Sequence, residues 1–297
     1  MKLKFMVTIV SAVIITNAYA AASYNVEAGL QYANSNTDDK TSQKIMSIAG
    51  TYYLQSIAND PSQPFAEMDF LQKASSLNLL YSNINYESNT FASTTINPIS
   101  FGGNFYADKF SFGASTSSWG NTNFNFKSNS SHYIGIKSTK TNFNFGYFVT
   151  PTTLVSFVNS KESANYSPSA GLSAVNDLTV TTNGLKSHTV TSLSGSESIA
   201  VDLAYNQIRS EQDTSQSNVE YGLNVRYYPE ANYYFEGGYK INSGDYAADK
   251  GNTYSLGAGI KLTPNFGLML TTSKFSVSDS TQNSGKTSTV LTAGYRF

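Results

Sequence analysis

The sequence predicts an all-β fold: a transmembrane antiparallel up-and-down β-barrel of about fourteen strands, within a range of twelve to sixteen. Three observations predict it. Apolar and polar residues alternate along many segments, charged residues make up only 13% of the chain, and the chain ends on an aromatic residue, Phe297. A soluble domain carries about 25% charged residues. A wall with lipid on one side and water on the other needs apolar residues dispersed at a period of two.

The first twenty residues have the pattern of a signal peptide. Lys2 and Lys4 precede an apolar run over residues 5–15, and Ala18-Tyr19-Ala20 has the small-x-small form of a cleavage site. The alternative, a membrane anchor, is disfavoured because the apolar run is too short to span a bilayer. We therefore expect a signal peptide at 1–20 and a barrel at 21–297. The chain has no cysteine, which excludes a disulfide framework and a lipidation site.

Half-polar strands follow the signal peptide in order. We expect them at residues 23–34, 44–55, 65–87, 99–107, 110–118, 143–149, 154–163, 185–193 and 198–208. Two segments are ambiguous. Residues 65–87 are too long for one strand, and their apolar parity shifts between Phe70 and Leu77, which indicates a bulge or a hidden turn. Residues 132–149 hold either one strand or a strand with a loop excursion.

Alternation is clearest in the last five strands, at residues 219–227, 233–241, 252–263, 266–272 and 288–297. In one of them Tyr254, Leu256 and Ile260 share a face, opposite Ser255 and Lys261. Short turns containing Pro151, Pro229 and Pro264 are expected at one end of the barrel. Long polar loops are expected at the other end, at residues 35–43, 89–95, 120–130, 164–184, 209–217, 244–251 and 278–285. This asymmetry is typical of outer-membrane barrels. Loop 164–184 either enters the lumen or extends the wall outward.

The closing strand resembles the C-terminal assembly signal of bacterial outer-membrane proteins, through Gly294, Tyr295 and Phe297. Its apolar face would meet lipid, and its final aromatics would lie at the membrane interface. The expected partners are therefore outer-membrane lipids and the barrel-assembly machinery, and the expected location is the bacterial outer membrane.

If the apolar parity faces lipid, charges of both signs face the lumen. Beside Arg296, the expected pore-lining residues are Glu27, Glu67, Asp69, Lys73, Asp202, Glu220, Arg226, Glu236, Lys240 and Lys261. Mixed charges among Gly, Ser, Asn and Thr are typical of a water-filled lumen. Alternatively, neighbouring charges pair across strands and hold the wall together, as Arg226 and Glu236 would. The dense cluster at residues 65–73 forms either a constriction or, as we favour, a rim next to Pro64.

Catalysis has little support in the sequence. The chain has two histidines, His132 and His188, and it lacks the zinc, nucleophile-elbow and P-loop motifs. We therefore expect no enzyme activity, no metal and no cofactor. Without Lys2 and Lys4 the chain carries 17 basic and 20 acidic residues, too small an imbalance to indicate a nucleic-acid partner.

Several features together resemble the general porins of Gram-negative bacteria: the Pro-Phe-Ala-Glu stretch ending at Glu67, the Tyr-Tyr-Pro229 and Leu-Thr-Pro264 turns, and the terminal Gly-Tyr-Arg-Phe297. The resemblance implies passive diffusion of small polar solutes or ions. Many general porins are homotrimers, and the sequence leaves the oligomeric state open. The alternatives are an adhesive barrel of about eight strands, an outer-membrane enzyme, and a fatty-acid channel with an apolar lumen.

Overall fold

The computed structural model describes residues 23–38, 41–128, 132–169, 176–211, 217–244, 250–277 and 285–297. The predicted signal peptide lies outside these ranges and stays a prediction. The described residues form β1 (Ser23–Thr37), β2 (Ser42–Ala58), α2 (Met68–Leu71), β3 (Ser76–Glu87), β4 (Thr94–Ile96), β5 (Ile99–Ala107), β6 (Phe110–Asn125), β7 (Tyr133–Thr150), β8 (Thr153–Pro168), β9 (Leu178–Ser192), β10 (Ser198–Ser210), β11 (Ser217–Glu230), β12 (Tyr233–Gly244), β13 (Gly251–Thr263), β14 (Phe266–Val277) and β15 (Lys286–Arg296).

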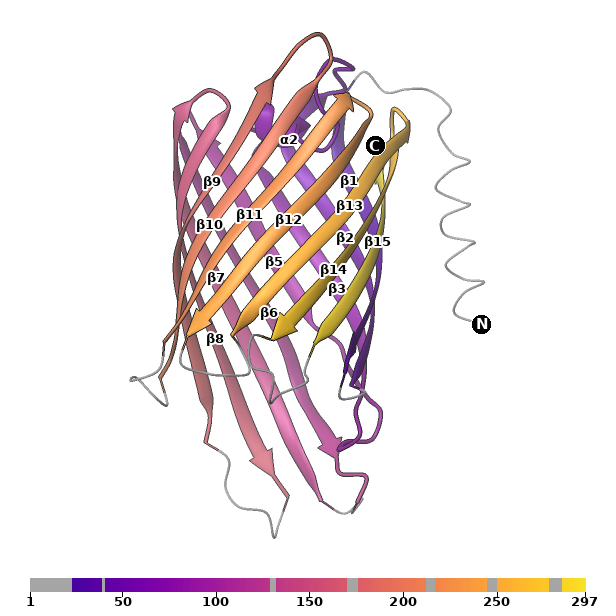
Figure 1. The fold of residues 1–297 in the computed structure, drawn as a ribbon, viewed down its shortest axis with the longest axis vertical. Coiled ribbons are helices and arrows are strands. Elements are labelled where there is room, and N and C mark those ends of the chain that lie inside the picture. Colours follow the sequence, from indigo (N-terminus) through magenta and orange to yellow (C-terminus); the bar gives the residue numbers. More distant parts are fainter. Residues whose placement is uncertain are drawn as a thin grey trace.

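The strands form a closed barrel in which each wall strand pairs antiparallel with its neighbours (Figure 1). Strand β15 pairs with β1 and closes the wall. Strands β4 and β5 pair in succession with β3, so they count as one interrupted strand. The predicted fourteen-stranded barrel is therefore confirmed. Among the described residues, no helix has the length and apolar character needed to cross a membrane.

The outer face of the barrel is covered by the apolar side chains of the alternating strands. Leu256 is 69% exposed, and Phe235 and Phe101 are similarly exposed at 56% and 55%. Side chains of the opposite parity point inward, where charged residues from different strands meet one another. An exterior of exposed aromatic and aliphatic side chains is stable in lipid and unfavourable in water. The alternation in the sequence therefore places apolar side chains toward lipid and polar side chains toward the interior, as expected.

The two ends of the barrel differ as predicted. Short turns join β5 to β6, β7 to β8, β11 to β12 and β13 to β14, and the C-terminus lies at the same end (Figure 1). At the opposite end the wall is longer than predicted. Strand β6 continues to Asn125, and β8 and β9 pair as far out as Ala164 with Leu178. The loops expected at 120–130 and 164–184 are thus partly wall strands, while their tips at 129–131 and 170–175 lie outside the described residues.

The two ambiguous segments have different outcomes. Residues 132–149 fall almost entirely in one uninterrupted strand, β7, without a loop excursion. The predicted strand at 65–87 is wrong over its first half, because β3 begins only at Ser76. The preceding residues 59–75, which we call the plug segment, leave the wall and carry helix α2. This explains the shift of apolar parity between Phe70 and Leu77.

Candidate functional site

The plug segment lies across the short-turn end of the barrel, where it builds the main buried core. Phe65, Met68 and Phe70 are between 1% and 9% exposed and belong to one apolar cluster. The wall contributes residues from seven strands to this cluster: Tyr24, Tyr53, Ile57, Phe148, Val190, Ala200, Tyr228 and Tyr234. The plug segment therefore contacts much of the barrel circumference from inside.

Tertiary contacts, and not helix propensity, hold this segment in place. A helix of four residues such as α2 is too short to be stable alone. The backbone N–H of Phe65 donates to the carbonyl of Ala231 at 2.9 Å. The Arg296 Nη2 donates to the Phe65 carbonyl at 3.0 Å. On the other flank, the Leu54 N–H donates to the carbonyl of Ser75 at 2.8 Å. Both ends of the plug segment are thus tied to the wall.

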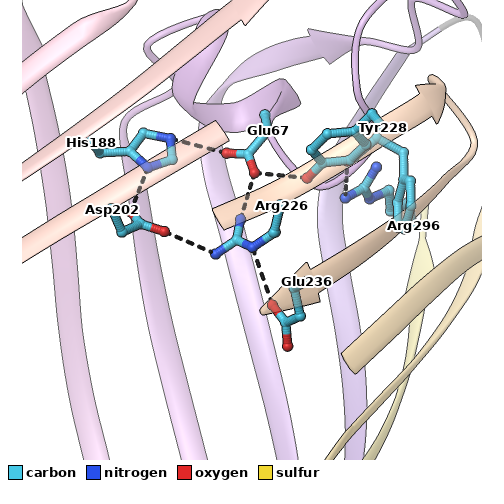
Figure 2. Close-up of polar contacts among 8 residues, drawn as sticks. Glu67, His188, Asp202, Arg226, Tyr228, Glu236 and Arg296 are labelled. Atoms are coloured by element: carbon cyan, nitrogen blue, oxygen red, sulfur yellow. Dashed lines mark hydrogen bonds and ion pairs between the residues drawn. The ribbon is translucent and has the colours of Figure 1, made fainter. Parts of the chain in front are cut away.

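Glu67 is the polar centre of the plug segment, and its side chain is only 3% exposed. Figure 2 shows wall residues converging on it. Arg226 Nη1 donates to Oε1, and the Tyr228 hydroxyl donates to the same oxygen at 2.7 Å. His188 Nε2 lies 3.0 Å from Oε2, an ion-pair contact without good hydrogen-bond alignment. A buried carboxylate is stable only with partners of this kind.

The contacts extend from Glu67 to two further carboxylates. His188 Nδ1 lies 2.6 Å from Asp202 Oδ1, and Arg226 lies 3.4 Å from both Asp202 and Glu236. Both ring nitrogens of His188 face carboxylate oxygens, and only the protonated imidazole can donate at both positions. The network therefore joins three acidic groups to two cationic ones.

Burial alone would raise the pKa of the Glu67 carboxyl, because it removes the charged form from water. The close contact with His188, the charge of Arg226 and the Tyr228 hydroxyl outweigh burial and hold this pKa below its ordinary value. Glu67 is accordingly ionised at neutral pH.

The structure places the remaining predicted pore-lining residues in several separate contacts. Glu27 pairs with Arg296 at 3.0 Å and Glu220 with Lys240 at 2.9 Å, each across the interior face. Arg226 and Glu236 are direct neighbours in the β11–β12 register, as the sequence suggested.

Three other predicted residues lie at the plug segment itself or against it. Lys261 donates from Nζ to the Asn59 side chain at 2.6 Å. Lys73 donates to the carbonyl of Asp108 in the β5–β6 turn, at the rim. Asp69 forms no ion pair within the described ranges.

Sequence reasoning did not assign His188 and Tyr228 to this site. His188 was considered only as a catalytic residue, although it shares the inward parity of Lys186 and Gly184 on β9. Tyr228 precedes Pro229 and was read as part of a turn. For both residues, the sequence indicated only that the side chain points inward close to a short turn. Their contacts with Glu67 depend on the path of the plug segment, and the alternation of residues along a strand cannot predict that path.

Among the described residues, a large cavity and a smaller one lie inside the barrel. The larger has a volume of ≈ 710 Å³, and half of its lining residues are Asn, Ser or Thr. Lys140, Lys186, His188 and Asp202 also line it, beside apolar residues such as Phe143 and Leu154. Several amides lie flat against glycines of the neighbouring strand; a Cβ on Gly113 would be 1.8 Å from Asn144 Oδ1. This arrangement keeps polar groups on the wall and the centre open. The smaller cavity, ≈ 230 Å³, lies beside the plug segment.

The site has no arrangement suited to acyl transfer. A serine nucleophile needs a histidine nitrogen free to accept its proton. Both nitrogens of His188 face carboxylates instead. Within the part of the chain that the structure describes, no group of three or more His, Asp or Glu side chains is arranged to hold a metal ion.

The closing strand joins the two ends of the wall. Gly294 is paired with Gly29, and Tyr295 with Ala28. The Phe297 N–H donates to the carbonyl of Val26 at 2.8 Å, and its own carbonyl accepts from Asn25. The C-terminal residues therefore take part directly in barrel closure.

No known sequence family matches the chain, and no curated protein matches it. Solved structures do match. The outer membrane protein Omp33 of Acinetobacter baumannii is 15% identical, with a TM-score of 0.56 over 93% of this chain and 99% of Omp33. The monoaromatic hydrocarbon channel CymD is 11% identical, with a TM-score of 0.59 over 92% of this chain and 89% of CymD. The toluene transporter TbuX of Ralstonia pickettii is 11% identical, with a TM-score of 0.53 over 93% of this chain and 90% of TbuX.

At these identities the likeness establishes the fold alone, that of a bacterial outer-membrane β-barrel. A closed barrel with an apolar exterior satisfies its backbone hydrogen bonds internally and exposes its apolar side chains to lipid. The chain is accordingly located in the bacterial outer membrane.

Proposed function

We propose that this protein is a porin through which small polar solutes and ions diffuse passively. The observation that carries the proposal is the ≈ 710 Å³ interior cavity, with its lining of Asn, Ser, Thr and Lys side chains. Amide and hydroxyl groups replace the hydrogen bonds of a hydrated solute without holding it tightly. A barrel of fourteen strands is also wide enough to leave space inside, whereas eight strands are filled by their own side chains.

Nine of the ten predicted pore-lining residues belong to this proposal, in two roles. We assign Glu67, Asp202, Arg226 and Glu236 to holding the plug segment, since they contact one another. We assign Glu27, Asp69, Glu220, Lys240 and Lys261 to the solute path, because they lie on the interior face or beside a cavity. Lys73, at the rim, has neither role.

CymD is described as a monoaromatic hydrocarbon channel and TbuX as a toluene transporter, which makes an apolar solute the natural competing proposal. The lining of the large cavity favours polar solutes instead, because Asn104, Asn142, Asn144 and Asn206 project amides where an aromatic solute needs apolar contact. An adhesive role acting through the long-loop end remains the second alternative from the sequence. An adhesive role needs no open lumen, so the two proposals differ in whether the barrel conducts ions.

The C-terminal strand supports a proposal about biogenesis. We propose that Gly294, Tyr295 and Phe297 form the signal read by the barrel-assembly machinery, because the strand that they end is the one that closes the wall. Homotrimer formation is an expectation from the resemblance to general porins alone.

Conductance of the refolded mature protein in planar bilayers tests the proposed function. Stable ohmic steps under a salt gradient are the expected result, and the sign of the reversal potential gives the ion preference. A folded barrel that inserts in the bilayer without conducting would exclude passive diffusion and favour adhesion. A second experiment distinguishes polar solutes from hydrocarbons. The rate at which protein-containing liposomes swell in polar solutes is compared with the rate at which they take up toluene.

A further inference from the structure

The plug segment does not fill the whole cross-section of the barrel. Beside it lies the smaller cavity, with Phe65, Ala66 and Asp69 of the plug segment on one side. The opposite side is formed mainly by β12–β15 and β1, through Glu27, Tyr234, Lys261, Phe266, Gly267, Leu268, Met269, Thr292, Gly294 and Arg296. The cavity therefore leaves space between part of the plug segment and one sector of the wall, beside the hydrogen bond from Arg296 to the Phe65 carbonyl that joins them.

A second cavity of ≈ 230 Å³ continues from this one at the outer rim. It is lined by Pro61 and Gln63 of the plug segment and by the β11–β12 and β13–β14 turns. The two cavities share Lys261 and Pro264. At their junction the Lys261 Nζ donates to Asn59 Oδ1 at 2.6 Å, and the Asn59 amide donates to the Pro264 carbonyl at 3.1 Å. These two hydrogen bonds lie where the two cavities meet.

The opposite flank of the plug segment is packed by aromatic side chains. Phe70 lies 5.6 Å from Phe148 and 4.3 Å from His188, measured between ring centroids. Tyr106 lies 5.9 Å from Phe148, and the Lys73 ammonium lies 4.4 Å from the Phe148 centroid. Close-packed rings leave no space for a hydrated solute.

We propose that solutes cross the short-turn end through the gap between the plug segment and the β13–β15 wall, with Asp69 and Lys261 as the residues that determine charge specificity. This inference rests on the proposed porin function and adds the route and the solute class. The plug segment stays in place during passage, and only the Lys261–Asn59 contact opens.

The charges along this passage sum to zero, and two of them lack an ionic partner. Glu27 and Arg296 neutralise each other at 3.0 Å. Within the described residues Asp69 forms no ion pair, and the polar contact of Lys261 is to a neutral amide oxygen. A small zwitterion with one ammonium and one carboxylate finds a counter-charge for each end. We therefore expect zwitterions of amino-acid size to pass faster than ions of either sign.

Cysteine modification tests the route, and the chain has no native cysteine to interfere. Met269→Cys and Ala66→Cys place a thiol on either side of the gap. Lys73→Cys is the matched control on the opposite flank of the same plug segment. Each refolded variant is recorded in a planar bilayer before and after addition of an anionic methanethiosulfonate, and labelling is confirmed by mass.

Labelling at positions 269 and 66 is expected to reduce conductance by more than half, while labelling at position 73 leaves it nearly unchanged. Block from position 73 together with free conduction at 269 and 66 would overturn the route. Equal insensitivity of all three labelled variants would show that the plug segment leaves the barrel, which also overturns it. Absence of conductance in the unmodified protein would instead contradict the proposed porin function.

Charge variants test the specificity. Asp69→Asn is expected to shift the reversal potential toward anions, and Lys261→Met toward cations. In liposome swelling, each substitution should lower the rate for glycine at least twofold and leave the rate for glycerol, which is similar in size and uncharged, unchanged. Equal effects on both solutes would show a change of pore width and contradict a role for charge.

The pH dependence adds a readout specific to Asp69. Desolvation by the surrounding barrel raises the pKa of the Asp69 carboxyl to about 6, and the charges of Glu27 and Glu67 add to the effect. The other groups facing the gap are Glu27, Arg296 and Lys261. As the pH falls from 7.5 to 5, the wild-type reversal potential should move toward anions, and that of Asp69→Asn should not move. A matching shift in the variant would assign the titration to another group.

Discussion

Arg226 donates a hydrogen bond to Glu67 although 159 residues separate the two in the sequence. The contact joins the plug segment to the wall near the short-turn end of β11, and His188 and the Tyr228 hydroxyl contact the same carboxylate. The barrel thus uses an ion pair from the interior to hold a connecting segment across its own opening. Loss of this contact is therefore expected to loosen the segment.

Glu67→Gln is expected to destabilise the protein by about 3 kcal/mol, because it leaves Arg226 and His188 without their carboxylate partner in a buried site. The plug segment should loosen, and conductance should rise and become noisier. Thermal unfolding and single-channel recording measure the two effects. Glu162→Gln is the matched control: Glu162 pairs with Lys140, both are over 40% exposed, and the loss should stay below about 1 kcal/mol. Equal losses in the two variants would contradict a structural role for Glu67.

Acid should release the plug segment before the wall unfolds. The pKa of Glu67 is lower in the folded protein than in the unfolded chain, so its stabilisation is complete above the ordinary glutamate value. The stabilisation is lost as the pH falls below that value and through the depressed pKa. Protease cleavage within residues 59–75 should therefore increase between pH 5 and pH 3, while the circular dichroism of the barrel persists. Cleavage that is already rapid at pH 7 would show that Glu67 does not hold the segment.

Gly259 is expected to be intolerant of a side chain, because the Tyr234 ring lies against it. A Cβ at this position would be 2.3 Å from Tyr234 Cε1. Gly259→Ala should push the ring away from Phe65 and Tyr228, its neighbours at 5.7 and 5.2 Å, and cost about 1–3 kcal/mol. Gly50→Ala, with no atom within 4 Å of the new Cβ, is the control. Unfolding midpoints of the two variants should differ clearly; coincident midpoints would argue against this packing.

The direction of the side chains can be tested on one strand. Leu256 is exposed on the outer face, and Leu256→Arg should cost about 2–4 kcal/mol near the bilayer midplane and impair membrane assembly. The neighbouring Ser255 has the inward parity, so Ser255→Arg should assemble normally and reduce conductance. The measurements are heat-modifiable mobility after refolding in lipid and single-channel current. Normal assembly of Leu256→Arg with failed assembly of Ser255→Arg would reverse the inside–outside assignment.

The sequence by itself determined the wall of this barrel. Alternation at a period of two is a local property, and lipid on one side with water on the other imposes it on each strand separately. The strand number, the outward position of Leu256 and the pairing of Arg226 with Glu236 in neighbouring strands could therefore be predicted. Where alternation failed, at residues 65–75, the sequence showed an irregularity without showing its form.

Only the tertiary structure decided what lies inside the wall. The plug segment has no periodicity of its own, and its four-residue helix is stable only against Phe148, Tyr228 and Tyr234 from distant strands. The contacts of Glu67 with His188 and Arg226 depend on where the segment crosses the lumen. Such contacts form when closure of the barrel brings β9 and β11 opposite the β2–β3 connection, because sequence spacing carries no information about distances across a lumen.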